Sequence, residues 1–134
     1  MNTMTDERTQ DTDSRARGSV LIVDDDPDVC GVLSDLLNEE GFETRSASNG
    51  LEALTQYQTI HPDAVLLDVF MPMFDGVKTL KALKNIDASA RVAMVTASCK
   101  REVIREAIQA GAVDFILKPF DLKQVMEKVE DLVA

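Results

Sequence analysis

The chain has 134 residues, the length of one domain, and its 45% hydrophobic and 28% charged residues are typical of a globular protein. Aspartate and glutamate number 24 against 14 lysines and arginines, which gives a net charge of −10. Since binding to phosphate backbones depends on basic groups, direct nucleic-acid binding is not expected. The apolar runs are far shorter than the ~20 residues of a membrane-spanning helix, so no membrane contact is expected.

The first 18 residues contain no Ile, Leu, Val or Phe. Such a segment cannot bury enough apolar surface to offset the entropy of ordering it. We therefore predict a flexible tail over residues 1–18 and one domain over residues 19–134. The two cysteines, Cys30 and Cys99, are too few for a disulfide framework, and the N-terminus has no apolar core like that of a secretory signal. We expect a cytoplasmic protein.

From Ser19 onward, short apolar runs alternate with stretches whose apolar residues recur every three or four positions, which predicts alternating strands and helices. The expected strands cover residues 20–23, 43–47, 64–67, 91–96 and 114–117. The expected helices include residues 29–37, 50–58, 76–86, 100–110 and 121–133. Strict alternation predicts an α/β fold, with a doubly wound, five-stranded parallel sheet covered by five helices.

Two local patterns add detail to these helices. Asp26 stands directly before Pro27, and this pair predicts an N-cap and a first helical residue more than a metal ligand. In the second helix we expect Leu51, Leu54 and Tyr57 on the core side. In the fourth helix, Ile108 is among the positions expected to face inward.

Polar side chains gather where the predicted strands end. These residues are Asp24, Asp25, Asp26, Asp68, Thr96 and Lys118. Ligands of such sheets bind beyond the carboxyl ends of the strands, where the strand order reverses. Carboxylates at this density repel one another, and a hard dication such as Mg²⁺ would offset the repulsion. The lysine and the threonine suit phosphoryl oxygens, and an aspartate can act as the nucleophile that forms an acyl phosphate.

Four motifs at the strand ends carry a resemblance to a known family. They are Val23-Asp24-Asp25, Leu66-Leu67-Asp68 with Met71-Pro72 and Asp75-Gly76, Val95-Thr96-Ala97, and Lys118-Pro119-Phe120. With these motifs, residues 19–134 resemble the receiver domain of two-component response regulators, in particular the chemotaxis-type single-domain regulators. The resemblance implies the flavodoxin-like (βα)5 receiver fold.

The resemblance also implies a role for each site residue. Asp68 would be the phosphoacceptor and a Mg²⁺ ligand. Asp25 would bind Mg²⁺ directly, Asp24 would help through water, and the backbone carbonyl of Phe70 would complete the protein ligands. Lys118 would pair with the phosphoryl group, with a cis peptide bond to Pro119. Thr96 would bind a phosphoryl oxygen, and Phe115 would be the switch aromatic that follows it.

The implied partners are a sensor histidine kinase or a histidine phosphotransfer protein as phosphodonor and an unidentified output protein. The chain would be a monomer or a phosphorylation-dependent dimer. It would catalyse only its own phosphorylation and dephosphorylation, and so would not be an enzyme in the usual sense. Two positions are less standard for the family, Phe70 and Ser98. We hypothesise that Phe70 shields the acyl phosphate and slows its hydrolysis.

Other interpretations of the sequence remain. The chain could be a receiver module cut from a longer regulator, with its output domain missing. It could also be a phosphatase with an aspartate nucleophile, although Phe70 stands where such an enzyme would carry a second acid. A pseudo-receiver would have lost one of the acids or the lysine, and all are present. A flavodoxin-like cofactor binder would need a Gly-rich loop after the first strand, where acids stand instead.

Overall fold

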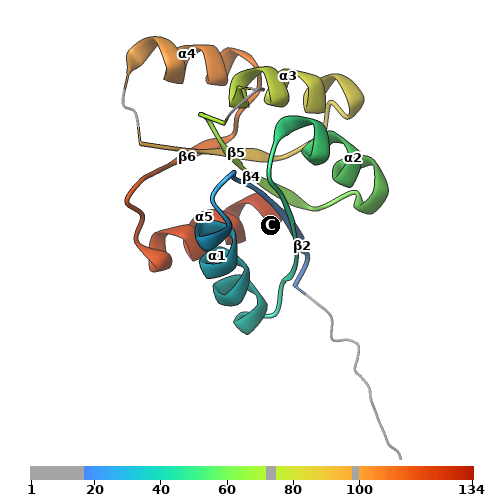
Figure 1. Cartoon of the computed structure of the whole chain (residues 1–134), viewed down its shortest axis with the longest axis vertical. Helices are drawn as coiled ribbons and strands as arrows, with labels where there is room; N and C mark the ends of the chain where they lie inside the picture. Colours follow the sequence, from blue (N-terminus) through green and yellow to red (C-terminus); the bar gives the residue numbers. More distant parts are fainter. Residues whose placement is uncertain (1–16, 72–74, 98–99) are drawn as a thin grey trace, which may run out of the picture.

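The computed structural model describes residues 17–71, 75–97 and 100–134. It contains β2 (Ser19–Val23), α1 (Pro27–Glu39), β3 (Glu43–Ala47), α2 (Gly50–Ile60), β4 (Ala64–Asp68), α3 (Gly76–Ile86), β5 (Val92–Thr96), α4 (Arg101–Gln109), β6 (Asp114–Leu117) and α5 (Leu122–Val133). The strands form one parallel sheet in the order β3-β2-β4-β5-β6 (Figure 1). The predicted alternation and the parallel sheet are confirmed.

The central strands are apolar up to their last residues, Asp68 and Thr96, because helices cover both faces of the sheet. Every residue of β4 and β5 is buried. Along β2 the side chains alternate, so Leu21 and Val23 join one core and Val20 and Ile22 join the other. Helices α2, α3 and α4 lie over the first core, and α1 and α5 lie over the second (Figure 1). The molecule is therefore a three-layer sandwich.

Aspartate and asparagine side chains begin most of the helices. Asp26 accepts a hydrogen bond from the Asp28 amide and precedes Pro27, so its predicted role as the α1 N-cap is confirmed. Asn49, Asp75 and Asp121 cap α2, α3 and α5 in the same way. These caps fix where each helix begins relative to the strand before it.

Two expected core positions were wrong. Leu51 is 68% exposed and Ile108 is 57% exposed. The buried face of α2 is formed by Gly50, Ala53 and Tyr57, and that of α4 is centred on Ala107. In both helices a small residue faces the sheet closely, while the larger neighbour turns to the solvent. Apolar spacing alone cannot distinguish these two faces.

The amino-terminal edge of the sheet is held by Arg17. Its backbone amide donates to the Gly41 carbonyl, its guanidinium lies 2.6 Å from a Glu130 carboxylate oxygen, and it stacks over the Phe42 ring. Residues 1–16, together with Pro72, Ser98 and Cys99 of the expectations above, lie outside the described residues. No helix within the described part of the chain is long and apolar enough to cross a membrane.

Gly76 brings the start of α3 against the backbone that follows β4. Its amide donates to the Val69 carbonyl at 2.7 Å. A Cβ atom at this position would overlap the backbone carbonyl of Asp68 and the Cα of Val69. The contact therefore excludes any larger residue at position 76, and it fixes the backbone next to Asp68.

A pair of glycine-to-alanine variants tests this contact. Gly76→Ala should lower the free energy of unfolding by about 1–3 kcal/mol, because the added methyl group overlaps backbone atoms. Gly31→Ala should raise it by about 0.5–1 kcal/mol, because position 31 is helical and its Cβ would meet nothing within 4 Å. Urea unfolding of both variants measures the difference. Equal midpoints for the two variants would contradict the contact at Gly76.

Candidate functional site

Three carboxylates meet at the carboxyl edge of the sheet, where the strand order reverses between β2 and β4. Asp24 and Asp25 follow β2, and Asp68 ends β4. One carboxylate oxygen from each lies within 4.8 Å of the others. Asp24 and Asp68 are only 4% and 5% exposed, whereas Asp25 faces the solvent. The predicted convergence of acids at this edge is therefore present.

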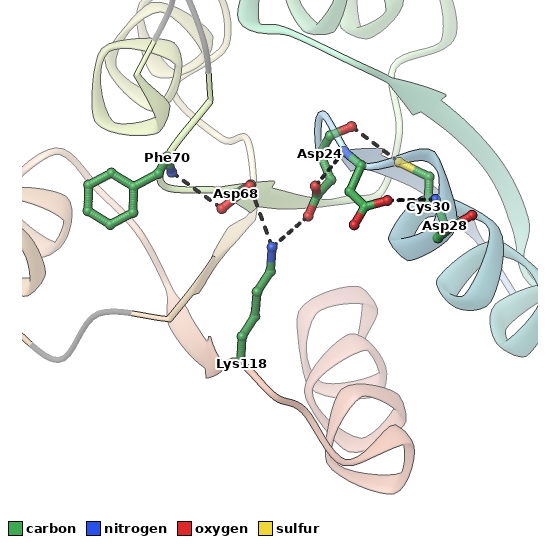
Figure 2. A network of polar contacts seen from close by, with 7 residues as sticks. Asp24, Asp28, Cys30, Asp68, Phe70 and Lys118 are labelled. Atoms are coloured by element: carbon green, nitrogen blue, oxygen red, sulfur yellow. Dashed lines mark hydrogen bonds and ion pairs between the residues drawn. The ribbon is translucent and has the colours of Figure 1, made fainter.

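Lys118 joins two of these acids. Its ammonium lies 2.9 Å from Oδ2 of Asp24 and 3.5 Å from Oδ2 of Asp68. Figure 2 shows the lysine side chain extending from the end of β6 to a point between the two carboxylates. The Lys118–Pro119 peptide bond is cis, as the resemblance implied. The ammonium offsets part of the repulsion between the acids.

The strand register positions the other predicted residues. Thr96 ends β5 beside Leu117 and is fully buried at the same edge of the sheet. Phe115, on β6, lies opposite Met94 of β5. Its side chain is partly buried and packs against the core under α2, α3 and α4. Direct contacts join Lys118 to Asp24 and Asp68, while the sheet register places Thr96 at the same edge and Phe115 three residues before Lys118.

Phe70 contributes its backbone and exposes its ring. The Phe70 amide donates to Oδ1 of Asp68 at 3.3 Å. The ring is 55% exposed and points away from the Asp68 carboxylate (Figure 2). Its role in shielding an acyl phosphate and the role of its carbonyl in metal binding therefore stay predictions.

The electrostatics of the cluster follow from burial and from its like charges. Burial and the nearby charge of Asp24 raise the pKa of Asp68, although Lys118 and the Phe70 amide act against this. Burial alone would lower the pKa of Lys118, but its bonds to Asp24 and Asp68 outweigh burial and raise it. Lys118 is therefore a cation at neutral pH, and the acids still carry an excess of negative charge.

The donor set fits Mg²⁺. All three cluster residues offer carboxylate oxygens, which are hard ligands that this ion prefers. No histidine or cysteine belongs to the metal-binding group found among the described residues, so the set does not favour zinc. An acidic cluster of this kind, at a strand-order reversal, is the geometry expected of a magnesium site.

Sequence reasoning missed two residues that shape the cluster. The Cys30 thiol lies 3.4 Å from the Asp24 carbonyl oxygen, and burial raises the pKa of this thiol to about 11, so it stays protonated and unreactive at neutral pH. Gly76 packs on the Asp68 backbone. In the sequence, Gly76 stands with Asp75 in one of the family motifs, but the motif does not indicate a contact with the Asp68 backbone.

Comparison with known proteins identifies the family. Residues 20–130 match the model of the response regulator receiver domain. The chain belongs to the response regulator receiver domain family. Its function is phosphorelay signal transduction, and receiver domains of this kind are signalling proteins and not enzymes in the usual sense.

Individual relatives of this receiver domain differ in length. The chemotaxis protein CheY of Bacillus subtilis is 42% identical over 111 residues, which cover 82% of this chain and 92% of CheY. The regulatory protein AtoC of Escherichia coli is 42% identical over 106 residues, which cover 79% of this chain but only 23% of AtoC. The receiver domain is thus similar both to a short protein and to part of a much longer one.

A solved structure supports the same fold. The CheX–CheY–BeF3–Mg²⁺ complex from Borrelia burgdorferi contains a chain that matches with a TM-score of 0.82 and 34% sequence identity. The match covers 87% of this chain and 89% of that chain. The predicted flavodoxin-like receiver fold is confirmed.

The stability of an Asp68→Asn variant should depend on pH. Because the pKa of Asp68 is raised in the folded state, ionising it opposes folding. This cost is absent below the unfolded pKa of about 4 and develops as the pH rises through the folded pKa. Without Mg²⁺, we expect Asp68→Asn to unfold at higher urea concentration than the wild type at pH 7.5, with a smaller difference near pH 4.

Added Mg²⁺ is the control for this prediction. Mg²⁺ at 100 times its Kd should stabilise the wild type by about 2.7 kcal/mol at pH 7.5, and it should stabilise Asp68→Asn less because one ligand is lost. If the two proteins had the same midpoint at pH 7.5 without Mg²⁺, the ionised Asp68 would carry no folding cost.

Proposed function

We propose that Asp68 accepts a phosphoryl group from a phosphohistidine of a sensor histidine kinase or a histidine phosphotransfer protein. The observation that carries this proposal is the buried Asp68 carboxylate held beside Lys118 and a second acid at the switch point of the sheet. A buried structural acid would not need a second carboxylate as its neighbour. The alternative of a phosphatase acting on a small molecule has no such support.

In the proposed reaction, an Asp68 carboxylate oxygen attacks phosphorus in line with the leaving imidazole. A P–O bond forms, the P–N bond breaks, and its electron pair stays on the histidine nitrogen. Mg²⁺ held by Asp24, Asp25, Asp68 and the Phe70 carbonyl would supply positive charge for the phosphoryl oxygens. Lys118 already contacts Asp68, so its ammonium can pair with the transferred group without a large movement.

The switch would begin at Thr96. We propose that its hydroxyl turns toward the new phosphoryl group, and that Phe115 moves inward behind it. Phosphorylation adds about −1.5 to −2 charges, enough to bias a two-state element. Phe115 is partly buried and packs against the core under α2, α3 and α4, so an inward movement of its ring would increase its burial.

The surface that responds would be formed by α4, β6 and α5. Exposed apolar side chains lie there, namely Ile108, Val113, Leu117 and Leu122. We propose that an output protein binds this face and distinguishes the phosphorylated from the unphosphorylated form. CheX is bound to CheY in the Borrelia burgdorferi complex. We also propose that the chain is a monomer or a phosphorylation-dependent dimer, and that it is cytoplasmic.

Intact-protein mass spectrometry tests the phosphoacceptor. After incubation with Mg²⁺ and acetyl phosphate, the wild type should gain one phosphoryl group. Asp68→Asn should gain none, because the nucleophile is lost, and the wild type with EDTA should gain none either. Asp131→Asn, an exposed change on α5, should behave like the wild type. An adduct on Asp68→Asn would assign the reaction to another residue.

If the wild type shows no adduct, beryllofluoride binding decides the case. Stable binding in the presence of Mg²⁺ would mean that the acyl phosphate forms and hydrolyses quickly. Failure of both the adduct and beryllofluoride binding would contradict the proposed function.

The hypothesis about Phe70 has its own test. Phe70→Asn should speed the decay of the acyl phosphate several-fold, because an apolar side chain that would have to turn toward Asp68 to shield it is replaced by a polar one that can bind an attacking water. The decay is followed by mass after removal of acetyl phosphate. Ile86→Asn, at another exposed apolar position, is the matched control. Identical decay of Phe70→Asn and the wild type would rule out shielding by the ring.

A further inference from the structure

A groove lies next to the acidic cluster, on the side away from Lys118. It has a volume of about 580 Å³ and runs between α1 and the connection from β3 to α2. One wall is formed by Gly31, Ser34 and Asp35 of α1, and the other by Ser48 and Glu52. Asp24 and Asp25 line its inner end. We call it the α1–α2 groove. Its volume lies within the ~300–1,000 Å³ typical of ligand-binding pockets.

Gly31 opens the wall of this groove. It lies inside α1, where glycine costs about 0.5–1 kcal/mol relative to alanine. Its backbone is helical, and a Cβ atom there would meet nothing within 4 Å. Within the described residues, therefore, neither packing nor backbone conformation requires a glycine. An approaching side chain from outside the molecule would use the space that Gly31 leaves.

The groove combines an apolar interior with an acidic rim. Pro27, Cys30 and Ala47 contribute apolar surface, while the carboxylates of Asp25, Asp35 and Glu52 lie on three different elements. No lysine or arginine is among the described residues that line it. Glu52 is held in place because it accepts a hydrogen bond from the Ser48 amide at 2.7 Å. A long basic side chain matches this surface, with its stem on the apolar part and its cation at the rim.

We propose that the α1–α2 groove is a docking site for a basic segment of a partner protein. Because the acids are spread over the β2–α1 connection, α1 and α2, a segment with two basic side chains can pair with more of them than a single cation can. The groove adjoins the proposed Mg²⁺ cluster, with which it shares Asp24 and Asp25, and it is present without phosphorylation of Asp68.

The chain's own N-terminus does not match the groove. Residues 1–16 carry two arginines against four acidic residues, so their net charge has the wrong sign. Arg17 is bound to the Gly41 carbonyl, just before β3 begins, and the groove lies where β3 ends. The charge and the point of attachment both favour an occupant from another protein.

A peptide titration with the full-length protein tests the proposal. The probe is acetyl-Ala-Arg-Ala-Arg-Ala-amide, added to the 15N-labelled chain in saturating Mg²⁺, and the control peptide carries glutamine in place of arginine. The amide signals of Gly31, Ser34 and Ser48 should shift with the arginine peptide and not with the control. Saturating Mg²⁺ occupies the cluster, so that the shifts report the groove.

Variants at Gly31 separate the groove from general attraction to an acidic protein. Gly31→Gln, which fills the groove with a good helix former, should weaken binding of the peptide at least fivefold. Gly31→Ala should change it less than twofold. Asp35→Asn should weaken it about threefold, the size expected for one exposed ion pair.

Several outcomes would overturn the proposal. They are the absence of shifts, equal shifts with the glutamine peptide, and unchanged binding to Gly31→Gln. Spermidine binding as tightly as the peptide would indicate a site for free polyamines. Shifts of these amides on deletion of residues 1–16 alone would indicate the tail as occupant. Acetyl phosphate labelling of the same samples reports the proposed function separately.

Discussion

The repulsion between two buried carboxylates is the constraint on which this structure depends. Asp24 and Asp68 lie at the ends of neighbouring parallel strands, both almost inaccessible to solvent. Two like charges in such a place oppose folding unless cations offset them. Lys118 reaches both acids from β6, and its single charge leaves an excess that a dication can offset. The protein can thus fold with these acids buried, and the cluster still favours the binding of an added cation.

The backbone around the cluster serves the same constraint. The Phe70 amide donates to Asp68, and the Asp26 amide donates to Asp24. The bond from the Phe70 amide favours the charged form of Asp68. Gly76 keeps the start of α3 on the Asp68 backbone, which limits the positions that this carboxylate can adopt. The rigidity of the site therefore comes from main-chain contacts as much as from the sheet.

The sequence predicted the sheet and the acidic cluster because their signals are local or follow from simple rules. Apolar runs such as Val20–Val23 mark buried parallel strands, and parallel strands place Asp24, Asp68 and Lys118 at one edge. Leu51 and Ile108 were assigned to the wrong helix faces. The residues that face the sheet are small, Ala53 and Ala107, and the spacing of large apolar residues does not reveal them. The contact of Gly76 with the Asp68 backbone could not be predicted, because it joins two elements in three dimensions.

The two acids after β2 have different environments, and this difference separates the cluster from the α1–α2 groove. Asp24 is buried and bound to Lys118, and its carboxylate lies close to that of Asp68. Asp25 is exposed and lines the groove as well as the cluster. A cation in the groove and a dication in the cluster would therefore share the field of Asp25 and repel each other. By reciprocity, each would weaken the binding of the other by the same factor. Because a transferred phosphoryl group would add negative charge beside Asp25, it would reduce this repulsion and link the occupancy of the groove to the state of Asp68.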